Sequence, residues 1–459
     1  MVNEKCGIFG VYGKGLHASR LAFFGLFALQ HRGQEGSGIC STLGKELFIH
    51  KERGLVSQVF NEEIIESLSG HAAIGHNRYS TSGSKDLDCT QPILVNNSTI
   101  ALVHNGNLPS VTLLENFLKE RSISTQGMSD SVMIAEAIGS LVGEGAEIEE
   151  AISQIFSLIT GAFSILVMTK DKIIAFRDHC GIRPLVVGSL NGGYVFSSET
   201  CALLPIGAKF LRDVLPGEMV VVDEGGIRSK QLAKGTPKLD IFEFVYFSRP
   251  DSHLLGKSVY SVRKNFGIEL AKEYLLEADV VIPIPETAIP VAIGYSEKSG
   301  IPMEMGIVKN RYIHRTFIEP EQHIREQGVK VKLAPLKEVI DGKKVIVIDD
   351  SIVRGTTSKQ IVEMLFGAGA KEVHFLISSP PVKFPDFYGI DTPDQKELLA
   401  SHKSVSEMNT YLGATSLNFL SLEGMIKATS LPESSFCTSC FTGKYPIDIK
   451  ERGKELDLD

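Results

Sequence analysis

The chain lacks an excess of basic residues, a dense set of cysteines, internal repeats and low-complexity tracts. Its 459 residues include 47 Lys and Arg against 55 Asp and Glu, which gives a formal net charge of −8. Because nucleic acids and anionic membranes attract basic surfaces, this balance disfavours binding to either as the main activity, although it allows a local basic pocket for a phosphorylated metabolite. The seven cysteines are odd in number and widely spaced, which argues against a disulfide scaffold.

A leader peptide and a membrane span are also not expected. Residues 1–5 contain no apolar core of a signal peptide. The charge-free run 151–169 is nominally long enough to cross a membrane, but Ser153, Gln154 and a break at Thr160 divide it into an amphipathic helix and a short buried strand. We therefore expect a soluble, cytoplasmic protein with neither a membrane nor a nucleic-acid partner.

The composition that is present, 43% hydrophobic and 22% charged, is that of an ordinary globular protein. The first half is rich in strand-forming runs, and helical periodicity interrupts them at 111–118 and 132–142. The runs are 7–11, 72–75, 100–103, 163–168 and 219–222. Strands and helices in separate blocks predict layered α+β packing.

The pattern changes at the polar stretch 235–239, so we expect one domain over residues 6–238 and a second over residues 239–459. Beyond this boundary, strands expected at 280–284, 344–348 and 373–378 alternate with helices expected near 289–298 and 357–366. This rhythm predicts an α/β domain with a mostly parallel sheet and crossover helices. Ligands of such sheets bind at the carboxyl ends of the strands.

The clearest motif is residues 344–357, where a buried strand ends in Asp349 and Asp350 and a loop with Gly355 leads into two threonines that open a helix. Backbone N–H groups at a helix N-terminus, together with hydroxyls, form a phosphate site. The two carboxylates could bind sugar hydroxyls or a Mg²⁺ ion shared with substrate phosphates. Alternatively, the aspartates merely end a strand and a threonine caps the helix. That alternative suits any one residue better than it suits the whole ordered string.

This string resembles the phosphoribosyl diphosphate (PRPP) signature of type I phosphoribosyltransferases. The resemblance implies that the acidic pair meets the ribose hydroxyls and that the following loop holds the 5-phosphate. The PRPP-binding residues that it implies are Asp349, Asp350, Ser351, Arg354, Gly355, Thr356 and Thr357. It further implies Mg²⁺ bound with PRPP at Asp349, Asp350 and Thr287.

Two other segments fit the same resemblance. The loop 284–290 stands where these enzymes hold the diphosphate, with Glu286 and Thr287 as conservative departures from the usual residues; an ordinary proline-containing loop is the alternative. The basic segment 309–328 is expected to be a lid that closes over the diphosphate, or else a solvated basic loop. Its phosphate-binding candidates are Lys309, Arg311, Arg315 and Arg325.

The cysteine near the N-terminus, Cys6, would by itself be interpreted as a small buried hydrophobe. Its neighbours along the first half change that interpretation. The relevant motifs are 31–36, 75–81, 104–108, 129–131 and 181–184. Together they resemble the glutamine amidotransferases of the N-terminal-nucleophile class, which implies an αββα sandwich and a propeptide, residues 1–5, removed to expose Cys6.

The chemistry of that class gives roles to particular residues. A free α-amine on Cys6, with an ordinary pKa of about 7.7–8.0, can serve as the general base for its own thiol. The Asn105 side chain and the Gly106 N–H match the family's oxyanion hole. Arg78 would pair with the glutamine carboxylate and Asp130 with its α-ammonium group. Helix N-capping is a second, compatible explanation of Asp130.

A glutaminase followed by a PRPP domain resembles the amidophosphoribosyltransferase family over nearly the whole chain. The resemblance implies that glutamine, PRPP and water give phosphoribosylamine, diphosphate and glutamate, in the first committed step of de novo purine biosynthesis. It also implies internal passage of ammonia, feedback inhibition by purine nucleotides and a homotetramer. The second domain would comprise the transferase and a C-terminal extension.

The chain departs from many of these relatives at a metal site. Those relatives hold an iron–sulfur cluster on four cysteines; Cys437 and Cys440 match two of them, whereas Asp240 and Asp386 stand at the other two positions. Such clusters normally use thiolates. The site is empty, holds a zinc-like ion on mixed ligands, or keeps an atypical cluster. Of the three, we expect no iron–sulfur cluster.

Two rival functions remain from the sequence. Another amidotransferase of the same nucleophile class, such as glucosamine-phosphate or asparagine synthase, would not need the motif 344–357. A non-catalytic PRPP-sensing regulator would need neither Cys6 nor the Asn105 and Gly106 pair. Release of glutamate that depends on PRPP separates all three hypotheses.

Overall fold

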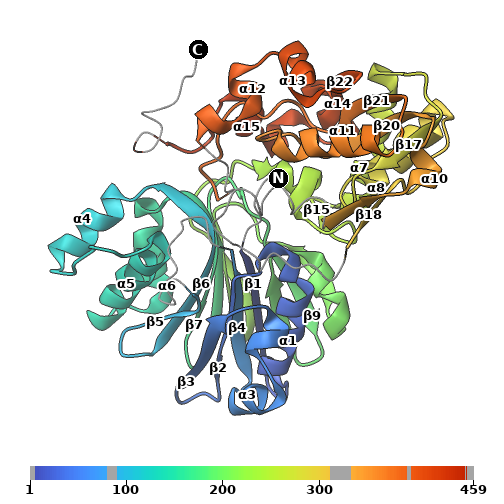
Figure 1. Cartoon of the computed structure of the whole chain (residues 1–459). Coiled ribbons are helices and arrows are strands. Elements are labelled where there is room, and N and C mark those ends of the chain that lie inside the picture. Colours follow the sequence, from blue (N-terminus) through green and yellow to red (C-terminus); the bar gives the residue numbers. More distant parts are fainter. Residues whose placement is uncertain (1–5, 80–89, 311–331, 390–393, 450, 452–459) are drawn as a thin grey trace.

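The computed structural model describes residues 6–79, 90–310, 332–389, 394–449 and 451. Within this part of the chain, two antiparallel sheets in the first half are followed by a parallel sheet in the second (Figure 1). Among the described residues no helix is long and apolar enough to cross a membrane.

The first sheet has the order β11-β9-β10-β1-β4-β2-β3. Its strands are β1 (Gly7–Gly13), β2 (Gly36–Thr42), β3 (Leu47–Arg53), β4 (Ala72–Arg78), β9 (Val186–Leu190), β10 (Gly193–Ser197) and β11 (Lys209–Asp213). The second sheet has the order β13-β12-β8-β7-β6-β5. Its strands are β5 (Ile93–Val95), β6 (Ile100–Ser110), β7 (Thr160–Met168), β8 (Ile173–Arg177), β12 (Glu218–Asp223) and β13 (Gly226–Gln231).

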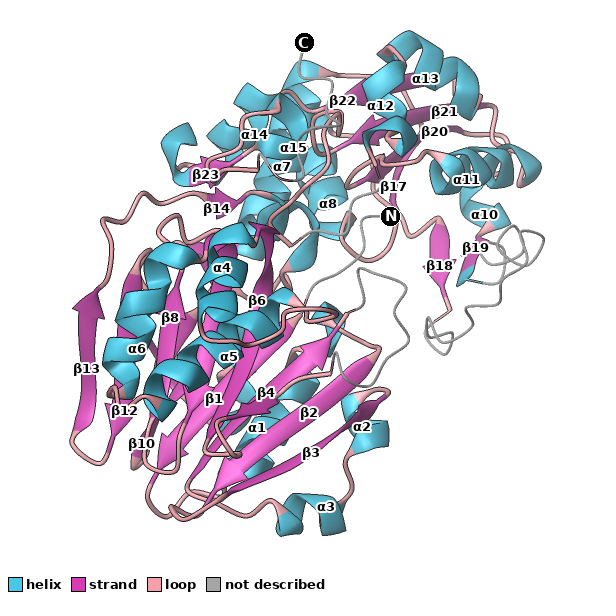
Figure 2. Ribbon diagram, turned by 90° about the vertical axis from the view of Figure 1, so that its left-hand side faces the viewer, coloured by secondary structure: helices cyan, strands magenta, loops and turns pink. Residues whose placement is uncertain are grey.

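The two sheets pack face to face, because alternate residues of each strand point to the same side. Ile8 and Ile74 of the first sheet meet Val103 and Leu166 of the second in one buried apolar layer. Helices cover both outer faces, as Figure 2 shows. They are α1 (Ala18–Ala28), α2 (Val56–Val59) and α3 (Glu62–Ser67) on the first sheet, and α4 (Thr112–Glu120), α5 (Asp130–Gly143) and α6 (Ile148–Ile155) on the second. The αββα sandwich expected from the sequence is confirmed, as is the division of 151–169 between a helix and a strand.

The second half is built on a sheet with the order β17-β20-β21-β22, in which every pair is parallel. Its strands are β17 (Val280–Pro283), β20 (Lys344–Asp349), β21 (Glu372–Ile377) and β22 (Ser416–Phe419). The crossovers between its strands contain α8 (Ile289–Ser299), α11 (Thr356–Gly367) and α13 (Val405–Leu412), while α7 (Val259–Glu273) precedes β17 and α14 (Leu422–Thr429) follows β22. The mostly parallel sheet expected from the sequence is confirmed.

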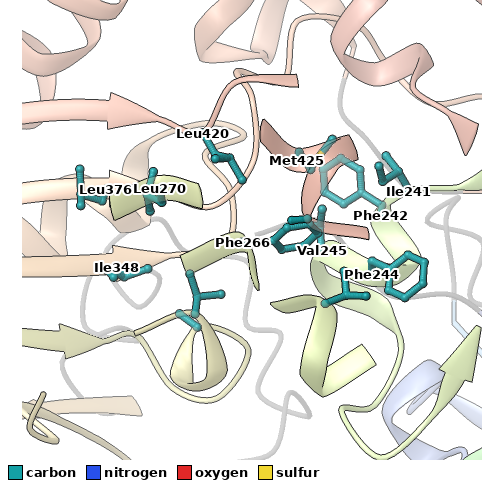
Figure 3. Packing of buried hydrophobic residues seen from close by; sticks show 14 of the residues in the cluster. Ile241, Phe242, Phe244, Val245, Phe266, Leu270, Ile348, Leu376, Leu420 and Met425 are labelled. Carbon is teal, nitrogen blue, oxygen red and sulfur yellow. The ribbon is translucent and has the colours of Figure 1, made fainter. Parts of the chain in front are cut away.

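Both faces of this sheet are covered, so β17 and the middle of β20 are continuously apolar. Ile346 and Ile348 contribute to the core on one face, and Val345 and Val347 to the core on the other. The first of these cores continues into the π-helix 243–247 and α14, as Figure 3 shows for Phe244, Phe266 and Met425.

The second half also contains several short elements outside this sheet. They are β14 (Leu239–Asp240), β15 (His253–Leu254), β16 (Lys257–Ser258), β18 (Ile307–Lys309), β19 (Leu333–Pro335), β23 (Phe436–Cys437), α10 (Lys337–Ile340), α12 (Leu399–His402) and α15 (Ser439–Thr442). The pair β14–β23 joins the segment after the sandwich to the C-terminal extension in parallel register.

Candidate active site

Cys6 lies immediately before β1, next to the end of β4. The antiparallel register places Gly7 opposite Asn77, which brings Cys6 beside Arg78. The Cys6 Sγ lies 4.0 Å from the carbonyl oxygen of Tyr79. Cys6 is half-buried and Arg78 is 9% exposed. The pairing of β1 with β4, two neighbouring strands in the middle of the sheet, therefore places the expected nucleophile beside the expected carboxylate-binding arginine.

The expected oxyanion residues lie on β6, on the facing sheet. Asn105 is fully buried, and within the described chain neither atom of its side-chain amide has a hydrogen-bond partner. A buried amide without partners is costly unless a ligand satisfies it. At Gly106 a Cβ atom would lie 2.0 Å from the carbonyl oxygen of Ala162, so only glycine fits.

Asp130 is the first residue of α5, but it does not cap the helix. The cap is Ser129, whose Oγ accepts a hydrogen bond from the Val132 N–H at 3.3 Å. The capping explanation of Asp130 was therefore wrong by one residue. Instead, Asp130 Oδ2 accepts a hydrogen bond from the Leu108 N–H at 3.1 Å. This contact ties the expected ammonium-binding carboxylate to the strand that carries the oxyanion residues.

Two buried histidines lie close to these groups. His104 Nδ1 is 2.9 Å from Ser131 Oγ, whereas its Nε2 has no partner among the described residues and lies on the Gly106 side. Burial lowers the pKa of His104, and it lowers the pKa of His76 to about 3. Both rings are therefore neutral at pH 7. The sequence analysis gave them no task, because a histidine within a motif does not reveal its burial.

In the second half, the acidic pair stands at the carboxyl end of β20. The Asp350 N–H donates to Asp349 Oδ1 at 2.9 Å, and the Ser351 hydroxyl donates to Asp350 Oδ1 at 2.6 Å. The Thr287 hydroxyl donates to Asp350 Oδ2, which joins the two loops across 63 residues. This contact follows from the fold, because the parallel strands β17 and β20 are neighbours and end at the same edge.

The pKa values of both carboxyl groups of this pair are raised. Burial raises the pKa of Asp349 well above its ordinary value, and the neighbouring Asp350 charge raises it further. Burial also raises the pKa of Asp350, and the hydrogen bonds from Ser351 and Thr287 partly offset that effect. A hard cation would relieve this repulsion, and these oxygen donors are the kind that Mg²⁺ prefers. The residues present therefore fit Mg²⁺.

The loop that follows leads into α11. Gly355 occupies the position before the helix with a φ of +76°, and a Cβ atom there would lie 2.5 Å from Leu399 Cδ2. No side chain caps this helix, so the suggestion that Thr356 or Thr357 does so was wrong. The first N–H groups of the helix are thus left for an anion. Arg354 forms an exposed ion pair with Glu397, with Nη2 and Oε2 2.6 Å apart.

The other PRPP candidates are only partly described. The peptide bond between Pro285 and Glu286 is cis, and the Glu286 side chain is exposed. Lys309 ends β18 and is also exposed. Arg311, Arg315 and Arg325 lie outside the described residues.

Two of the four positions compared with cluster ligands lie beside an arginine. Arg183 is fully buried; its Nη1 lies 3.2 Å from Asp240 Oδ2 and its Nη2 lies 3.9 Å from Asp386 Oδ1. Cys437 pairs with Asp240 in the β14–β23 register. The described residues, which include all four positions, contain no group of three or more metal-ligating side chains that could hold an ion. Burial raises the pKa of both Cys437 and Cys440, which disfavours thiolates. This donor set therefore does not fit a metal.

A buried ion network that the sequence analysis missed continues from this point. Glu243 accepts from Arg183 Nη1 at 3.2 Å and from Arg32, which also donates to Glu199. His31 Nε2 lies 2.6 Å from the same Glu199. The partners are far apart in sequence, so spacing carried no signal. The only hint was a glutamate within the apolar segment 241–247.

Comparison with known proteins finds one family match in each half of the chain. Residues 76–205 match the family of glutamine amidotransferase domains, and residues 261–379 match the family of phosphoribosyl transferase domains. The amidophosphoribosyltransferase of Synechococcus elongatus is 47% identical, over 99% of this chain and 94% of that protein. That of Bacillus subtilis is 44% identical, over 98% and 95%.

Solved structures give the same result. The glutamine PRPP amidotransferase from B. subtilis, complexed with ADP and GMP, superposes with a TM-score of 0.90 at 44% identity, covering 97% of this chain and 98% of that one. A structure described as the allosteric regulatory enzyme of purine biosynthesis superposes with a TM-score of 0.91 at 44% identity, covering 97% of each chain.

Proposed function

Because the chain belongs to the amidophosphoribosyltransferase family, we propose that its two sites carry out that family's reaction at the residues described above. The enzyme hydrolyses glutamine and transfers the ammonia to PRPP, which gives phosphoribosylamine and diphosphate at the start of de novo purine biosynthesis. The observation that carries the assignment of residues is a combination within one chain. The sandwich carries an unpartnered buried amide on β6 and a half-buried cysteine before β1, and the parallel-sheet half carries a buried carboxylate pair followed by a helix start that no side chain caps.

In the glutaminase half, removal of residues 1–5 would leave the thiol and the α-amine of Cys6 on one residue. The amine takes the thiol proton, and Sγ attacks the carboxamide carbon of glutamine. The Asn105 amide and the Gly106 N–H then stabilise the oxyanion. Arg78 holds the α-carboxylate and Asp130 the α-ammonium group. The α-ammonium group of Cys6 gives its proton to the carboxamide nitrogen, which leaves as ammonia as the thioester forms. Water then hydrolyses the thioester to release glutamate and the free thiol.

In the transferase half, Asp349 and Asp350 orient the ribose hydroxyls, and the loop 351–357 holds the 5-phosphate at the start of α11. Glu286 and Thr287 face the diphosphate, and Lys309, Arg311 and Arg315 close over it. Ammonia attacks C1 of the ribose as diphosphate leaves. Mg²⁺ would be held by Asp349, Asp350 and Thr287, and it would supply neutralising charge to the leaving diphosphate.

The remaining proposals concern the whole enzyme. Ammonia passes between the sites inside the protein, and the enzyme is a cytoplasmic homotetramer. Purine nucleotides inhibit it, as the ADP and GMP complex of the B. subtilis relative supports. Inhibition by added GMP and ADP, and the mass of the assembly in light scattering, test these two points.

The experiment that tests the residue assignments compares glutamine and ammonia as nitrogen donors. Mass spectrometry should find Cys6 at the start of the mature chain. Cys6→Ala should lose glutamine-dependent synthesis and keep ammonia-dependent synthesis, while Cys40→Ala, at a buried cysteine outside both sites, should keep both. A Cys6→Ala variant with full glutamine-dependent activity would exclude Cys6 as the nucleophile. Asp349→Asn combined with Asp350→Asn should abolish both activities, and unchanged use of PRPP by that variant would exclude the site.

A further inference from the structure

A loop of the transferase half touches the oxyanion strand of the glutaminase half. The Asn107 side chain donates to the carbonyl oxygen of Phe387 at 2.8 Å. At Gly389, whose φ is +112°, a Cβ atom would lie 3.2 Å from the carbonyl carbon of Gly106 and 3.3 Å from its Cα. The loop 386–389 therefore packs directly against the backbone that is to stabilise the oxyanion, at the junction of the two halves (Figure 1).

Arg183 binds the loop 386–389 through its side chain. Its Nε donates to the carbonyl oxygen of Tyr388 at 3.1 Å, and the Tyr388 N–H donates to Asp386 Oδ1 at 2.8 Å. The Arg183 carbonyl accepts a hydrogen bond from Ser164 Oγ at 3.1 Å, and Ser164 stands opposite Asn105 in the β6–β7 register. One arginine thus contacts the loop through its side chain and the oxyanion sheet through its backbone.

The charges around Arg183 favour a guanidinium over a Zn²⁺ ion between the Asp240 and Asp386 carboxylates. Asp240 and Asp386 stand where the family resemblance implies cysteine ligands; Asp240 Oδ2 lies 3.2 Å from Arg183 Nη1 and Asp386 Oδ1 lies 3.9 Å from Arg183 Nη2. A buried carboxylate needs a positive partner, and a buried guanidinium needs a negative one. A Zn²⁺ ion held between these two carboxylates would meet the fixed positive charge of Arg183.

We propose that Asp240, Arg183 and Asp386 form a metal-free ion-pair clamp, which replaces the cluster of relatives and holds loop 386–389 against Gly106 so that the oxyanion hole keeps its geometry. The proposal rests on the function proposed above. Arg183 and Gly389 are positioning residues in this account, since neither needs to touch glutamine.

The first test is Gly389→Ala, with Gly413→Ala as its matched control. Both glycines have positive φ and both lie in the second half, but a Cβ atom at Gly413 would meet nothing within 4 Å. Loss of an oxyanion donor lowers kcat by about 10²–10³, so a displaced one should lower the glutamine-dependent kcat by about 10-fold. The KM for glutamine and the ammonia-dependent activity should stay within about 2-fold, and Gly413→Ala should change neither activity. Equal loss of both activities in Gly389→Ala, or no loss, would overturn the proposal.

The second test alters the clamp itself and remains decisive if Gly389→Ala fails to fold. Arg183→Met alone removes the positive charge beside the Asp240 and Asp386 carboxylates, so it is combined with Asp240→Asn and Asp386→Asn. This neutral triple variant should lose glutamine-dependent kcat as Gly389→Ala does and keep ammonia-dependent activity. The single variant Arg183→Lys keeps the positive charge, so its loss of glutamine-dependent kcat should be smaller. A triple variant with wild-type glutamine-dependent kcat contradicts the clamp.

Metal analysis of wild-type protein purified without oxygen provides a readout that does not depend on activity. Iron, sulfide and zinc should all be substoichiometric, and one equivalent of zinc or a full iron–sulfur cluster would refute the metal-free clamp. Failure of the proposed function looks different, because the wild-type protein itself would then release no glutamate in the presence of PRPP.

Discussion

Glu243→Gln should destabilise the protein more than any ordinary surface substitution. The Glu243 carboxylate is fully buried in the π-helix and accepts from Arg32, from Arg183 Nη1 at 3.2 Å and from Ser248 Oγ at 2.7 Å. A glutamine of the same size removes the charge and turns an N–H₂ group towards one of these donors. Breaking a buried pair by removing one partner typically costs about 3–5 kcal/mol, because the other charge stays buried and unpaired.

The pH dependence of this effect has a definite sign. Burial alone would raise the pKa of Glu243, but Arg32 and Arg183 more than offset burial, so its pKa is lowered overall. A lowered folded-state pKa contributes stability that is fully present above the unfolded pKa, about 4.3, and is lost as the pH falls through the folded value. The difference between Glu243→Gln and wild type should therefore be full at pH 7 and shrink in acid.

The assay is urea unfolding at pH 7, followed by far-UV circular dichroism and tyrosine fluorescence, since the chain has no tryptophan. Glu224→Gln is the matched control, because its exposed carboxylate pairs with Lys14 on the surface and should cost nothing measurable. A Glu243→Gln midpoint equal to that of Glu224→Gln would refute the claim that the buried network stabilises the fold.

Three further predictions concern the two sites. Gly106→Ala should abolish glutamine-dependent synthesis and spare the ammonia-dependent reaction, because its Cβ atom would lie 2.0 Å from the Ala162 carbonyl oxygen; equal kinetics with both donors would contradict this. Thr287→Val should raise the KM for PRPP several-fold with either nitrogen donor, since it removes a hydrogen bond to Asp350, while Thr410→Val, on the exposed surface of α13, should not. Asp349→Asn should raise the thermal stability of the ligand-free protein at pH 7 while abolishing PRPP use: a carboxyl group whose folded-state pKa is raised costs stability as the pH rises above its unfolded pKa. A lower melting temperature would show that the Asp349 charge is compensated.

The sequence was most informative where function is local. Asp349, Asp350 and Gly355 are consecutive in one strand-loop-helix unit, and the buried strand predicted before them is present as β20. The strand at β22 and the helices α13 and α14 were not predicted, because short, mixed segments carry little periodicity. The exact caps also escaped prediction: Ser129 rather than Asp130 caps α5, and Gly355 rather than a threonine stands at the cap position of α11. At helix ends the backbone geometry decides the cap, and neighbouring polar residues compete for it on nearly equal terms.

Interactions between the halves were beyond the reach of the sequence. The contact between Asn107 and Phe387 joins residues 280 positions apart, and that between Arg32 and Glu243 joins residues 211 apart. Nothing in either local pattern indicates the other. Asp240 and Asp386 were interpreted as departures from a ligand set, but the side chain that lies beside them, Arg183, belonged to a motif already explained by the glutaminase resemblance.

These long-range contacts form one continuous charged path through the interior. It runs from His31 through Glu199, Arg32 and Glu243 to Arg183, where Asp240 and Asp386 end it. Its members come from segments far apart in the sequence, and Glu243, in the second half, contacts both Arg32 and Arg183 of the first half. The carboxylates cannot separate from their guanidiniums without leaving buried charges unpaired. These buried ion pairs therefore oppose movement of one half relative to the other. They keep the loop 386–389 in contact with the oxyanion strand.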